Sequence, residues 1–576
     1  MRLGLAIVSI FIALCNSQAD DLTKYVDPLI GTEGAIPGSS LGGGNMFPGV
    51  AIPFGQVKLG IDTSVLNLDQ GGISSANSGY TPRGNATGFS LLHTSGTGGP
   101  DLRAKVWRCF ADALAGVAGG TKINVADNRT YLTNRTNEDQ RNPGGWDSKE
   151  PYYDDWYTMW DIFRCTTPFY HLVYTNRYVG MLRSIIDTWR FDGYLPDGRS
   201  GNQNGRTQGG SNADNVLADA YVKGLNKVKS INWKDAYKAV QKDAEVTPRR
   251  NIDFNAFDGG TKEGRNALPD WVSLGYITQD YSRSISKGVE YAQNDFAAYL
   301  LAKTLGSKKD AENNWKNFWN ENATVDLGDA GLGVHKGFFG SKSAQGVFDA
   351  SLTYEGLIWE YSFNVPHDTA ALIKLMDGPA GFERRLDASF IEGFSMGAGP
   401  ANTAGTALFN PGNEPSFQTP FLYNYINGKQ YKTVEKTRYI VNKYYSLARS
   451  GIPGNQDAGA MATWLLWNLL GLYPVTSQPV YLLSAPFFKA VDVRIGTGDP
   501  TSASHQSKTY LRIRAPDLDA NHPYVQGVKI NGKPINRSFI WHDEIINGGV
   551  LEFTMGPEAV GWDSGELPPS LSTGWK

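Results

Sequence analysis

Single acidic residues in short polar loops are the side chains of this sequence best suited to chemistry. "GNEPS" carries Glu414 and "GNQDAGA" carries Asp457, each ahead of an apolar segment. "YEGLIWEYSF" carries Glu355 and Glu360, and "GGSNADNVLADAYVKG" carries Asp214. Two carboxyl groups can hydrolyse a glycosidic bond, one as a protonated acid and one activating water or attacking carbon. The same loops offer the carboxylate, amide and carbonyl oxygens that Ca²⁺ prefers.

Structural interpretations apply to Asp457 and to several other polar residues. Asp457 precedes an apolar helix, where an acidic residue commonly acts as the N-cap. Asp368, just after Pro366, marks a helix start equally well. Asp219 fits a solvated or internally paired helix residue, and His93 in "GFSLLHTSGTGG" is either a structural histidine or a ligand contact. The spacing alone therefore supports only a secreted helical enzyme of the glycosidase kind.

The elements that must position these loops are helical from about residue 146 to 475. Ile285, Val289, Phe296 and Leu300 fall on one helical stripe, and "MATWLLWNLLGLY" is apolar all round, which predicts a helix buried on every side. Many helices joined by Gly/Pro-rich loops suggest a helical toroid or barrel. Loops at one end of such a barrel converge on one mouth, so acids distant in sequence can meet there.

A further stripe predicts where one helix ends. Val434, Val441, Tyr445 and Ala448 share a face, and the following "SG" makes Gly451 a ready C-cap. We therefore expect this helix to continue to about residue 450.

The two ends of the chain have β character. Residues 20–145 are rich in turn signals with short apolar runs. Residues 476–576 alternate with period two, and Asn531-Gly532 is a strong hairpin signal. We expect a β-rich N-terminal region, a helical region over 146–475 and a small antiparallel β region at the C-terminal end.

Composition narrows the class of function. The 576 residues exceed one ordinary core, so two or three domains are expected. Formal net charge is −3 with no long run of either sign, which argues against nucleic acid as the main partner.

The first nineteen residues have the features of a secretory signal peptide. Arg2 precedes the apolar run "LGLAIVSIFIALC", and "NSQA" offers a cleavage site after Ala19. No later segment is long and apolar enough to span a membrane. Five Asn-X-Ser/Thr sequons favour a secreted glycoprotein. With Cys15 in the signal, Cys109 and Cys165 remain; whether they pair stays open.

Several ordered segments carry a family resemblance. They include "GGGNMFPGVAIPFGQVKLGIDT", "GFSLLHTSGTGG", "YTMWDIFRCTTPFYHL", "GGSNADNVLADAYVKG", "YEGLIWEYSFNVPHD", "NEPSFQTPFLYNY" and "GNQDAGAMATWLLWNLLGLYPV". On these motifs the chain resembles glycoside hydrolase family 92, the calcium-dependent, inverting exo-α-mannosidases, from about residue 25 to 560. The resemblance implies a multidomain α and β fold, in which an (α/α)6 barrel follows a β-sandwich and precedes a small β domain.

The resemblance also implies roles for single residues. Glu355 matches the general acid, Asp457 the general base and Glu414 a Ca²⁺ ligand, with Glu360 as the reserve acid. The residues expected to contact substrate are His93, Asp62, Asp214 and Asn413. The implied substrate is a glycan or glycoprotein with terminal, α-1,2-linked mannose, met outside the cell or in the vacuole.

The chain departs from the family pattern in three places. Phe417 and Gln418 stand where two histidines usually follow "NEPS", and Asn455-Gln456 leave Asp457 as the lone acid of its loop. The sequence between about residue 107 and "WDIFR" is shorter than in the family, so the sandwich is expected to be truncated. These departures motivate one alternative, a glycan-binding pseudoenzyme. A second alternative, a helical-barrel hydrolase or lyase for another polysaccharide, applies if the resemblance is shallow.

Overall fold

The structure is a computed structural model. It describes residues 26–33, 46–51, 58–63, 80, 85–90, 150, 158–200, 203–204, 207–248, 263–305, 311–328, 331–395, 406–496 and 509–574. The expected signal peptide, His93 and Cys109 lie outside these residues.

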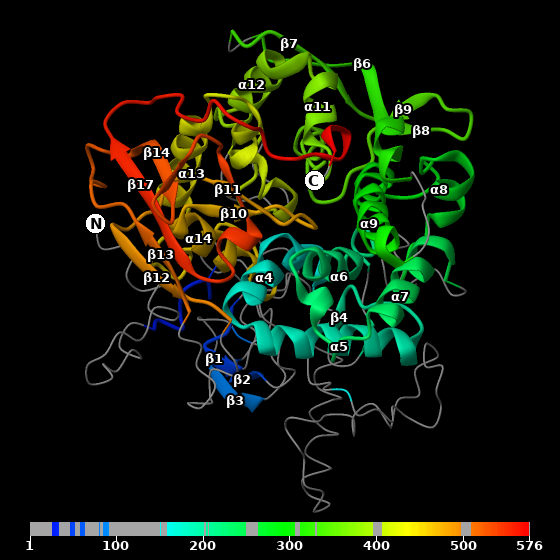
Figure 1. Cartoon of the computed structure of the whole chain (residues 1–576). Helices are drawn as coiled ribbons and strands as arrows, with labels where there is room; N and C mark the ends of the chain where they lie inside the picture. Colours follow the sequence, from blue (N-terminus) through cyan, green and yellow to red (C-terminus); the bar gives the residue numbers. More distant parts are fainter. Residues whose placement is uncertain are drawn as a thin grey trace, which may run out of the picture.

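Helices make up most of the middle of the chain (Figure 1). They are α4 (Met159–Val173), α5 (Thr175–Asp192), α6 (Ala213–Val222), α7 (Trp233–Glu245), α8 (Leu268–Leu274), α9 (Ser284–Leu305), α10 (Ile358–Tyr361), α11 (Thr369–Leu375), α12 (Gly378–Ser389), α13 (Gln430–Tyr444) and α14 (Ala460–Leu470). The predicted multidomain α and β fold is confirmed.

The predicted apolar faces are buried. The stripe of α9 from Ile285 to Leu300 packs in the core, and α14 is buried along its length except at Ala462. Gly471, with a φ of 78°, ends α14 in the left-handed conformation that glycine adopts readily.

The predicted end of the helix at Gly451 is wrong. Helix α13 stops at Tyr444, and Tyr445 is extended. The Tyr445 ring stacks on Trp464 of α14 at 5.8 Å between ring centroids. The helical stripe correctly predicts that the Tyr445 ring is buried. Tyr445 itself, however, lies just beyond the end of the helix.

Strands lie at both ends of the described chain and within the helical region. They are β1 (Gly49–Ala51), β2 (Lys58–Thr63), β3 (Ala86–Ser90), β4 (Arg199–Ser200), β5 (Gln203–Asn204), β6 (Trp319–Asp326), β7 (Val334–Phe339), β8 (Ser341–Lys342), β9 (Phe348–Ala350), β10 (Leu472–Pro474), β11 (Val480–Leu483), β12 (Ala490–Arg494), β13 (Tyr510–Arg514), β14 (Tyr524–Ile530), β15 (Lys533–Ile535), β16 (Phe539–Trp541) and β17 (Gly549–Gly556). Strands β1–β3 form one antiparallel sheet. The hairpin β6–β7 interrupts the stretch that was expected to be helical.

The C-terminal strands form a three-stranded sheet, β10-β11-β16, and a five-stranded sheet, β12-β13-β17-β14-β15. The hairpin prediction at Asn531-Gly532 is confirmed, because β14 and β15 pair around these two residues, whose φ angles are 50° and 77°. The expectation of a purely antiparallel region is wrong, since β13 and β17 pair in parallel. The long excursion through β14, β15 and β16 gives the chain room for that crossover.

Helix α4 lies between two hydrophobic cores. Cys165, Phe169 and Leu172 belong to the larger core, and Met159 and Ile162 belong to the second. Because both sides of α4 are packed in this way, a polar residue on it is held rigidly. Among the described residues, no helix is both long enough and apolar enough to cross a membrane.

Candidate active site

Two loops that carry acidic residues are in direct backbone contact. A Cβ atom on Gly454 would lie 2.2 Å from the carbonyl oxygen of Gly412, and one on Gly412 would lie 2.6 Å from that of Pro453. Only glycine allows this approach. The two glycines therefore bring Glu414, two residues after Gly412, close to Asp457, three residues after Gly454.

Three carboxylates meet where these loops reach helix α4. Asp161, in the first turn of α4, offers one oxygen that lies within 4.8 Å of one oxygen each of Glu414 and Asp457. Asp161 and Glu414 are 0% and 2% exposed, whereas Asp457 is half-buried. Asp161 was not among the residues predicted from the sequence. Its signal was present, since "MWDIFRC" places one acid and one arginine, three residues apart, in a mostly apolar helical run.

The carboxylates of the cluster, Asp161, Glu414 and Asp457, repel one another. Burial raises the pKa of Asp161 well above its ordinary value, and the charges of Glu414 and Asp457 raise it further. Burial raises the pKa of Glu414 to about 8. The pKa of Asp457 is raised well above its usual range by burial and then by Glu414 and Glu355. A bound cation would offset this repulsion.

The donor set of the cluster fits a hard divalent cation. Both carboxylate oxygens of Asp161 and Oε1 of Glu414 are buried, and among the described residues no donor outside these two carboxyl groups hydrogen-bonds them. Buried polar atoms are rarely left in this state, so the cluster has unused coordinating capacity. Oxygen ligands alone, in a group of three carboxylates, match Ca²⁺ better than metals that prefer nitrogen or sulfur.

Glu355 lies next to this cluster on an exposed loop. Its charge is close enough to raise the pKa of both Glu414 and Asp457. The side-chain amide of Asn413 donates a 2.6 Å hydrogen bond to the backbone oxygen of Glu355, which ties this loop to the one carrying Glu414. The structure thus brings Glu355, Glu414, Asp457 and Asn413 together.

The two carboxylates expected to do acid–base chemistry share an unusual backbone. Glu355 has a φ of 48° and Asp457 a φ of 41°, and Ala458 follows at 55°. Non-glycine residues in this left-handed region are strained by about 1–3 kcal/mol each, and such strain concentrates at functional sites.

Glu360, the reserve acid, braces two loops. Its carboxylate is buried and accepts hydrogen bonds from the Leu357 N–H at 2.7 Å and the Ser416 hydroxyl at 2.9 Å. Burial raises its pKa to about 7. These bonds join the loop after Glu355 to the loop after Glu414. Glu360 therefore stabilises the two loops from the buried side of the site.

Asp457 is not the N-cap of α14. Gly459 occupies the N-cap position of α14, and glycine has no side chain that could accept a hydrogen bond from the first turn. Instead Oε1 of Gln456 accepts a 3.0 Å hydrogen bond from the N–H of Ala462 in the first turn. Gln456 meets part of the capping need, and the Asp457 carboxylate faces the cluster.

Two other acidic residues named in the sequence analysis have structural roles. Asp368 caps α11, accepting from the Ala371 N–H at 3.4 Å. Asp219 forms a buried 2.6 Å ion pair with Lys223, which confirms the internally paired alternative.

The expected substrate contacts are not all gathered at the cluster. Asp214 is completely buried, accepting from the Ser211 hydroxyl at 2.6 Å and from Arg265 at 3.1 Å. Burial raises its pKa to about 7 despite Arg265. Asp62 lies in β2, opposite Gly88 of β3.

Phe417 and Gln418, which replace two histidines of the family pattern, both lie in the described part of the structure. Phe417 is buried, with its ring 6.0 Å from that of Trp464, and offers no polar group to a ligand. Gln418 is half-buried, and its Nε2 has no hydrogen-bond partner among the described residues. Cys165 is a free, buried thiol near Thr463.

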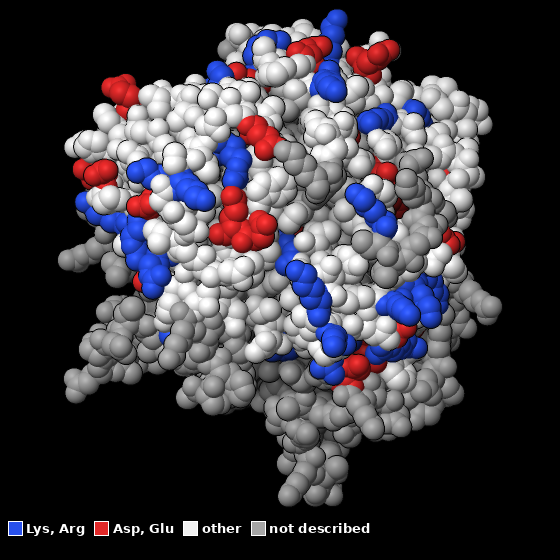
Figure 2. Space-filling model, in the orientation of Figure 1, with Lys and Arg blue, Asp and Glu red and all other residues white. Residues whose placement is uncertain are grey.

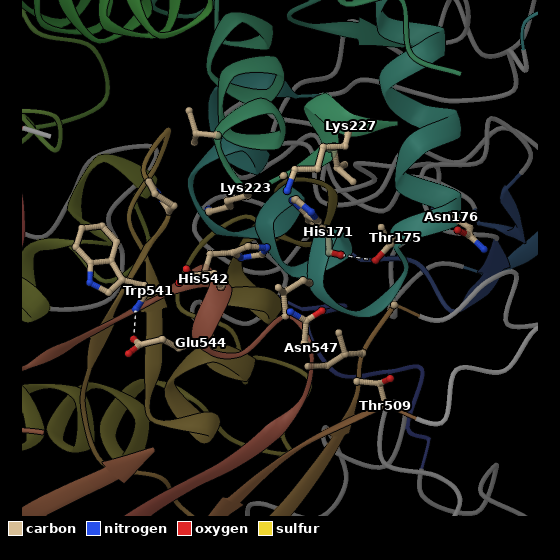
Figure 3. A pocket seen from close by; sticks show the side chains of 18 of the residues that line it. His171, Thr175, Asn176, Lys223, Lys227, Thr509, Trp541, His542, Glu544 and Asn547 are labelled. Atoms are coloured by element: carbon tan, nitrogen blue, oxygen red, sulfur yellow. Dashed lines mark hydrogen bonds between the residues drawn. The ribbon is translucent and has the colours of Figure 1, made fainter. Parts of the chain in front are cut away.

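A separate groove of about 1010 Å³ lies at the opposite end of α4 (Figure 3). Its lining includes His171, Thr175, Lys223, Lys227 and His542. Since His171 and Asp161 are ten residues apart on α4, they are separated by about 15 Å along the helix axis. The groove is therefore distinct from the carboxylate cluster, and its Lys223 is already neutralised by Asp219.

Positive and negative side chains are interspersed on the face drawn in Figure 2. There, Lys and Arg side chains alternate with Asp and Glu over the described surface, without a broad area of one sign.

Comparison with known families gives two matches along the chain. Residues 128–557 match the glycosyl hydrolase family 92 catalytic domain, and residues 25–144 match the glycosyl hydrolase family 92 N-terminal domain.

A curated relative and a larger group of solved structures are similar to the chain, and three of them are described below. An uncharacterized secreted glycosidase of Arthroderma benhamiae is 33% identical over 469 residues, which cover 75% of this chain and 53% of the relative. The chain thus spans about half the length of that protein. A family GH92 α-mannosidase of Bacteroides thetaiotaomicron, in complex with mannoimidazole, has a TM-score of 0.72 at 19% identity, covering 96% of this chain and 97% of that one. A family GH92 inverting mannosidase of the same organism has a TM-score of 0.68 at 18% identity, covering 97% and 100%. At these identities the two structures establish the fold alone.

Proposed function

Because the chain belongs to glycoside hydrolase family 92, we propose that it is an exo-acting α-mannosidase that depends on Ca²⁺ and inverts the anomeric centre. Its substrate is a glycan or glycoprotein with terminal α-linked, chiefly α-1,2-linked, mannose. Both similar structures are described as mannosidases, which supports this choice of sugar.

The observation that carries the proposal is the meeting of Asp161, Glu414 and Asp457, with Glu355 beside them. Asp161 and Glu414 are the most buried members and have oxygens that, among the described residues, no donor outside these two carboxyl groups hydrogen-bonds, so they are the principal cation ligands in this proposal. Asp457 is more exposed, which suits a group that must reach water.

The residues divide the reaction between them. Glu355, on the exposed loop, protonates the leaving glycosidic oxygen as general acid. Asp457 accepts a proton from the water that attacks the anomeric carbon from the opposite face of the sugar. Bound Ca²⁺ would supply positive charge that holds sugar hydroxyls and favours distortion of the ring towards a planar, oxocarbenium-like form. The hydrogen bonds of Asn413 and Glu360 hold the loop that carries Glu355 against the loop that carries Glu414.

The proposed setting is extracellular, with the vacuole as the alternative compartment. The N-terminal signal pattern supports this, as does the description of the relative as secreted. Asn322 and Asn536, two of the sequon residues, are exposed, as glycosylation requires.

The test is hydrolysis of α-1,2-mannobiose by the full chain, with and without a chelator. We expect mannose release that stops on chelation and returns with CaCl₂, with β-mannose as the first anomer seen by NMR. Glu355→Gln should lower kcat/KM by about 10³-fold or more, whereas Glu392→Gln, at an exposed surface residue, should match the wild type. Calcium-independent release, or full activity in Glu355→Gln, contradicts the mechanism. Binding of mannan without any release favours the pseudoenzyme.

A further inference from the structure

A fully buried glutamate on α9 gathers hydrogen bonds from two other parts of the chain. Glu290 is 0% exposed. Its carboxylate accepts from the Trp160 indole N–H at 2.5 Å, the Gly210 N–H at 2.7 Å, Arg164 at 3.1 Å and the Asn212 amide at 3.1 Å. Such a fully satisfied buried network makes a rigid junction.

Two of these four donors flank a member of the carboxylate cluster. Trp160 directly precedes Asp161 on α4, and Arg164 follows it three residues later. The Arg164 guanidinium partly opposes the rise that burial causes in the pKa of Asp161 and of Glu414, so its charge lies close to both. The position of Arg164 is fixed by its ion pair with Glu290.

The same junction reaches the loop of the proposed general acid. The Trp160 ring meets the Tyr354 ring edge-on at 5.5 Å, and Tyr354 directly precedes Glu355. The charge of Glu355 raises the pKa of the Tyr354 hydroxyl, in addition to the effect of burial, so these neighbouring side chains are close. A shift of Trp160 would therefore be transmitted to both the cation-binding and the acid-bearing parts of the site.

The loop before α6 packs closely against Glu290 through two glycines. A Cβ atom on Gly209 would lie 2.1 Å from Oε2 of Glu290, and one on Gly210 would lie 2.1 Å from Oδ1 of Asn294. This explains the paired glycines of "GGSNAD" as a packing requirement of the Glu290 junction.

We propose that Glu290 is a positioning residue, which holds Asp161 in place for cation binding, keeps the Arg164 charge paired beside it and, through Trp160 and Tyr354, orients the loop of Glu355. The inference rests on the proposed function in naming the cation as Ca²⁺. It adds a residue of α9 that touches neither cation nor sugar.

The chain provides a matched control for a purely structural role. Asp295 lies one residue beyond Asn294 on the same helix and is 9% exposed. It too accepts hydrogen bonds from an arginine and a tryptophan: Arg265 at 2.6 Å and Trp271 at 2.8 Å. Neither donor adjoins the carboxylate cluster in sequence. Loss of its charge should therefore cost stability without moving the site.

The experiment compares Glu290→Gln with Asp295→Asn in the full chain, below the melting temperature of both. Calcium affinity is measured by calorimetry, and kcat and KM on α-1,2-mannobiose are measured separately. We expect Glu290→Gln to weaken Ca²⁺ binding and to lower kcat by about 10- to 100-fold each, the usual effect of a group that orients metal ligands. Asp295→Asn should keep both values within about twofold of the wild type.

A milder variant covers the case in which Glu290→Gln fails to fold. Trp160→Phe removes the indole N–H while keeping an aromatic ring against Tyr354, and we expect a smaller loss of Ca²⁺ affinity in the same direction. Wild-type Ca²⁺ affinity in folded Glu290→Gln, or in Trp160→Phe when Glu290→Gln does not fold, overturns the inference, as does an equal loss in Asp295→Asn. Because Ca²⁺ binding is read without substrate, a wild-type protein that binds Ca²⁺ but hydrolyses no mannoside refutes the proposed function alone.

Discussion

The contact between Gly412 and Gly454 gives the sharpest test of how the site is assembled. In Gly454→Ala the new Cβ would lie 2.2 Å from the Gly412 carbonyl oxygen and 2.7 Å from its Cα. Both are backbone atoms, so no side chain can rotate away. Gly454 does not have a positive φ, and the substitution therefore tests the contact alone.

The size of the effect follows from the distance. A carbon–oxygen contact relaxes at about 3.3 Å, so the two loops must separate by about 1 Å. Overpacking of this kind destabilises by about 1–3 kcal/mol. A displacement of about 1 Å at reacting groups lowers catalysis by about 10²-fold. Because Glu414 and Asp457 follow the two glycines closely, the same movement opens the carboxylate cluster.

The assay is Ca²⁺ calorimetry together with kcat/KM on α-1,2-mannobiose for Gly454→Ala. Gly527→Ala is the matched control, because a Cβ atom on Gly527 of β14 would meet no described atom within 4 Å and Gly527 has no positive φ. We expect weakened Ca²⁺ binding and about a 10²-fold lower kcat/KM in Gly454→Ala, with near wild-type values in the control. Unchanged Ca²⁺ affinity and activity in Gly454→Ala would show that the glycine contact does not position the carboxylates.

Three further predictions concern the supports of the site and the stability of the fold. Glu360→Gln should lower kcat/KM by about 10-fold, far less than Glu355→Gln, because Glu360 only braces the loops; kinetics of the two side by side decide this, and an equal loss would make Glu360 the acid. Asn413→Ala removes the 2.6 Å bond to the Glu355 backbone and should lower kcat about 10-fold while Ca²⁺ affinity stays near wild type; an unchanged kcat would show that the bond is dispensable. Burial raises the pKa of Asp563 to about 6, so the stability that its protonation gives the folded state is lost as the pH rises through 6. Asp563→Asn lacks this titration. The difference in unfolding free energy, variant minus wild type, should therefore rise by about 2–3 kcal/mol from pH 4 to pH 8. Denaturant titrations in which this difference stays constant across the range would contradict the assignment.

Periodicity and turn chemistry predicted the elements whose cause is local. The stripe of α9, the buried α14 and the hairpin at Asn531-Gly532 depend on spacing within one segment, and each is confirmed. The end of α13 at Tyr444 and the parallel pairing of β13 with β17 depend on contacts with distant segments. No local pattern encodes those contacts.

The site divides in the same way. The acids of conspicuous polar loops, Glu355, Glu414 and Asp457, could be selected from the sequence, although their roles remain predictions. Asp161 was missed because a single acid in an apolar helix resembles any buried polar residue until its neighbours in space are known. Asp214 was expected near substrate, yet it lies in a buried pair with Arg265, which a partner 51 residues away in sequence decides.

The proposed mechanism depends on Asp161 and Glu414 holding Ca²⁺ beside the Asp457 carboxylate. Calorimetric titration of CaCl₂ into chelator-treated, folded wild-type protein and into Glu414→Gln tests this directly. We expect one Ca²⁺ bound per wild-type chain and at least a 10-fold weaker affinity in Glu414→Gln. Folded wild-type protein that binds no Ca²⁺, or a Glu414→Gln protein that binds it as tightly as the wild type, would show that these carboxylates are not a calcium site.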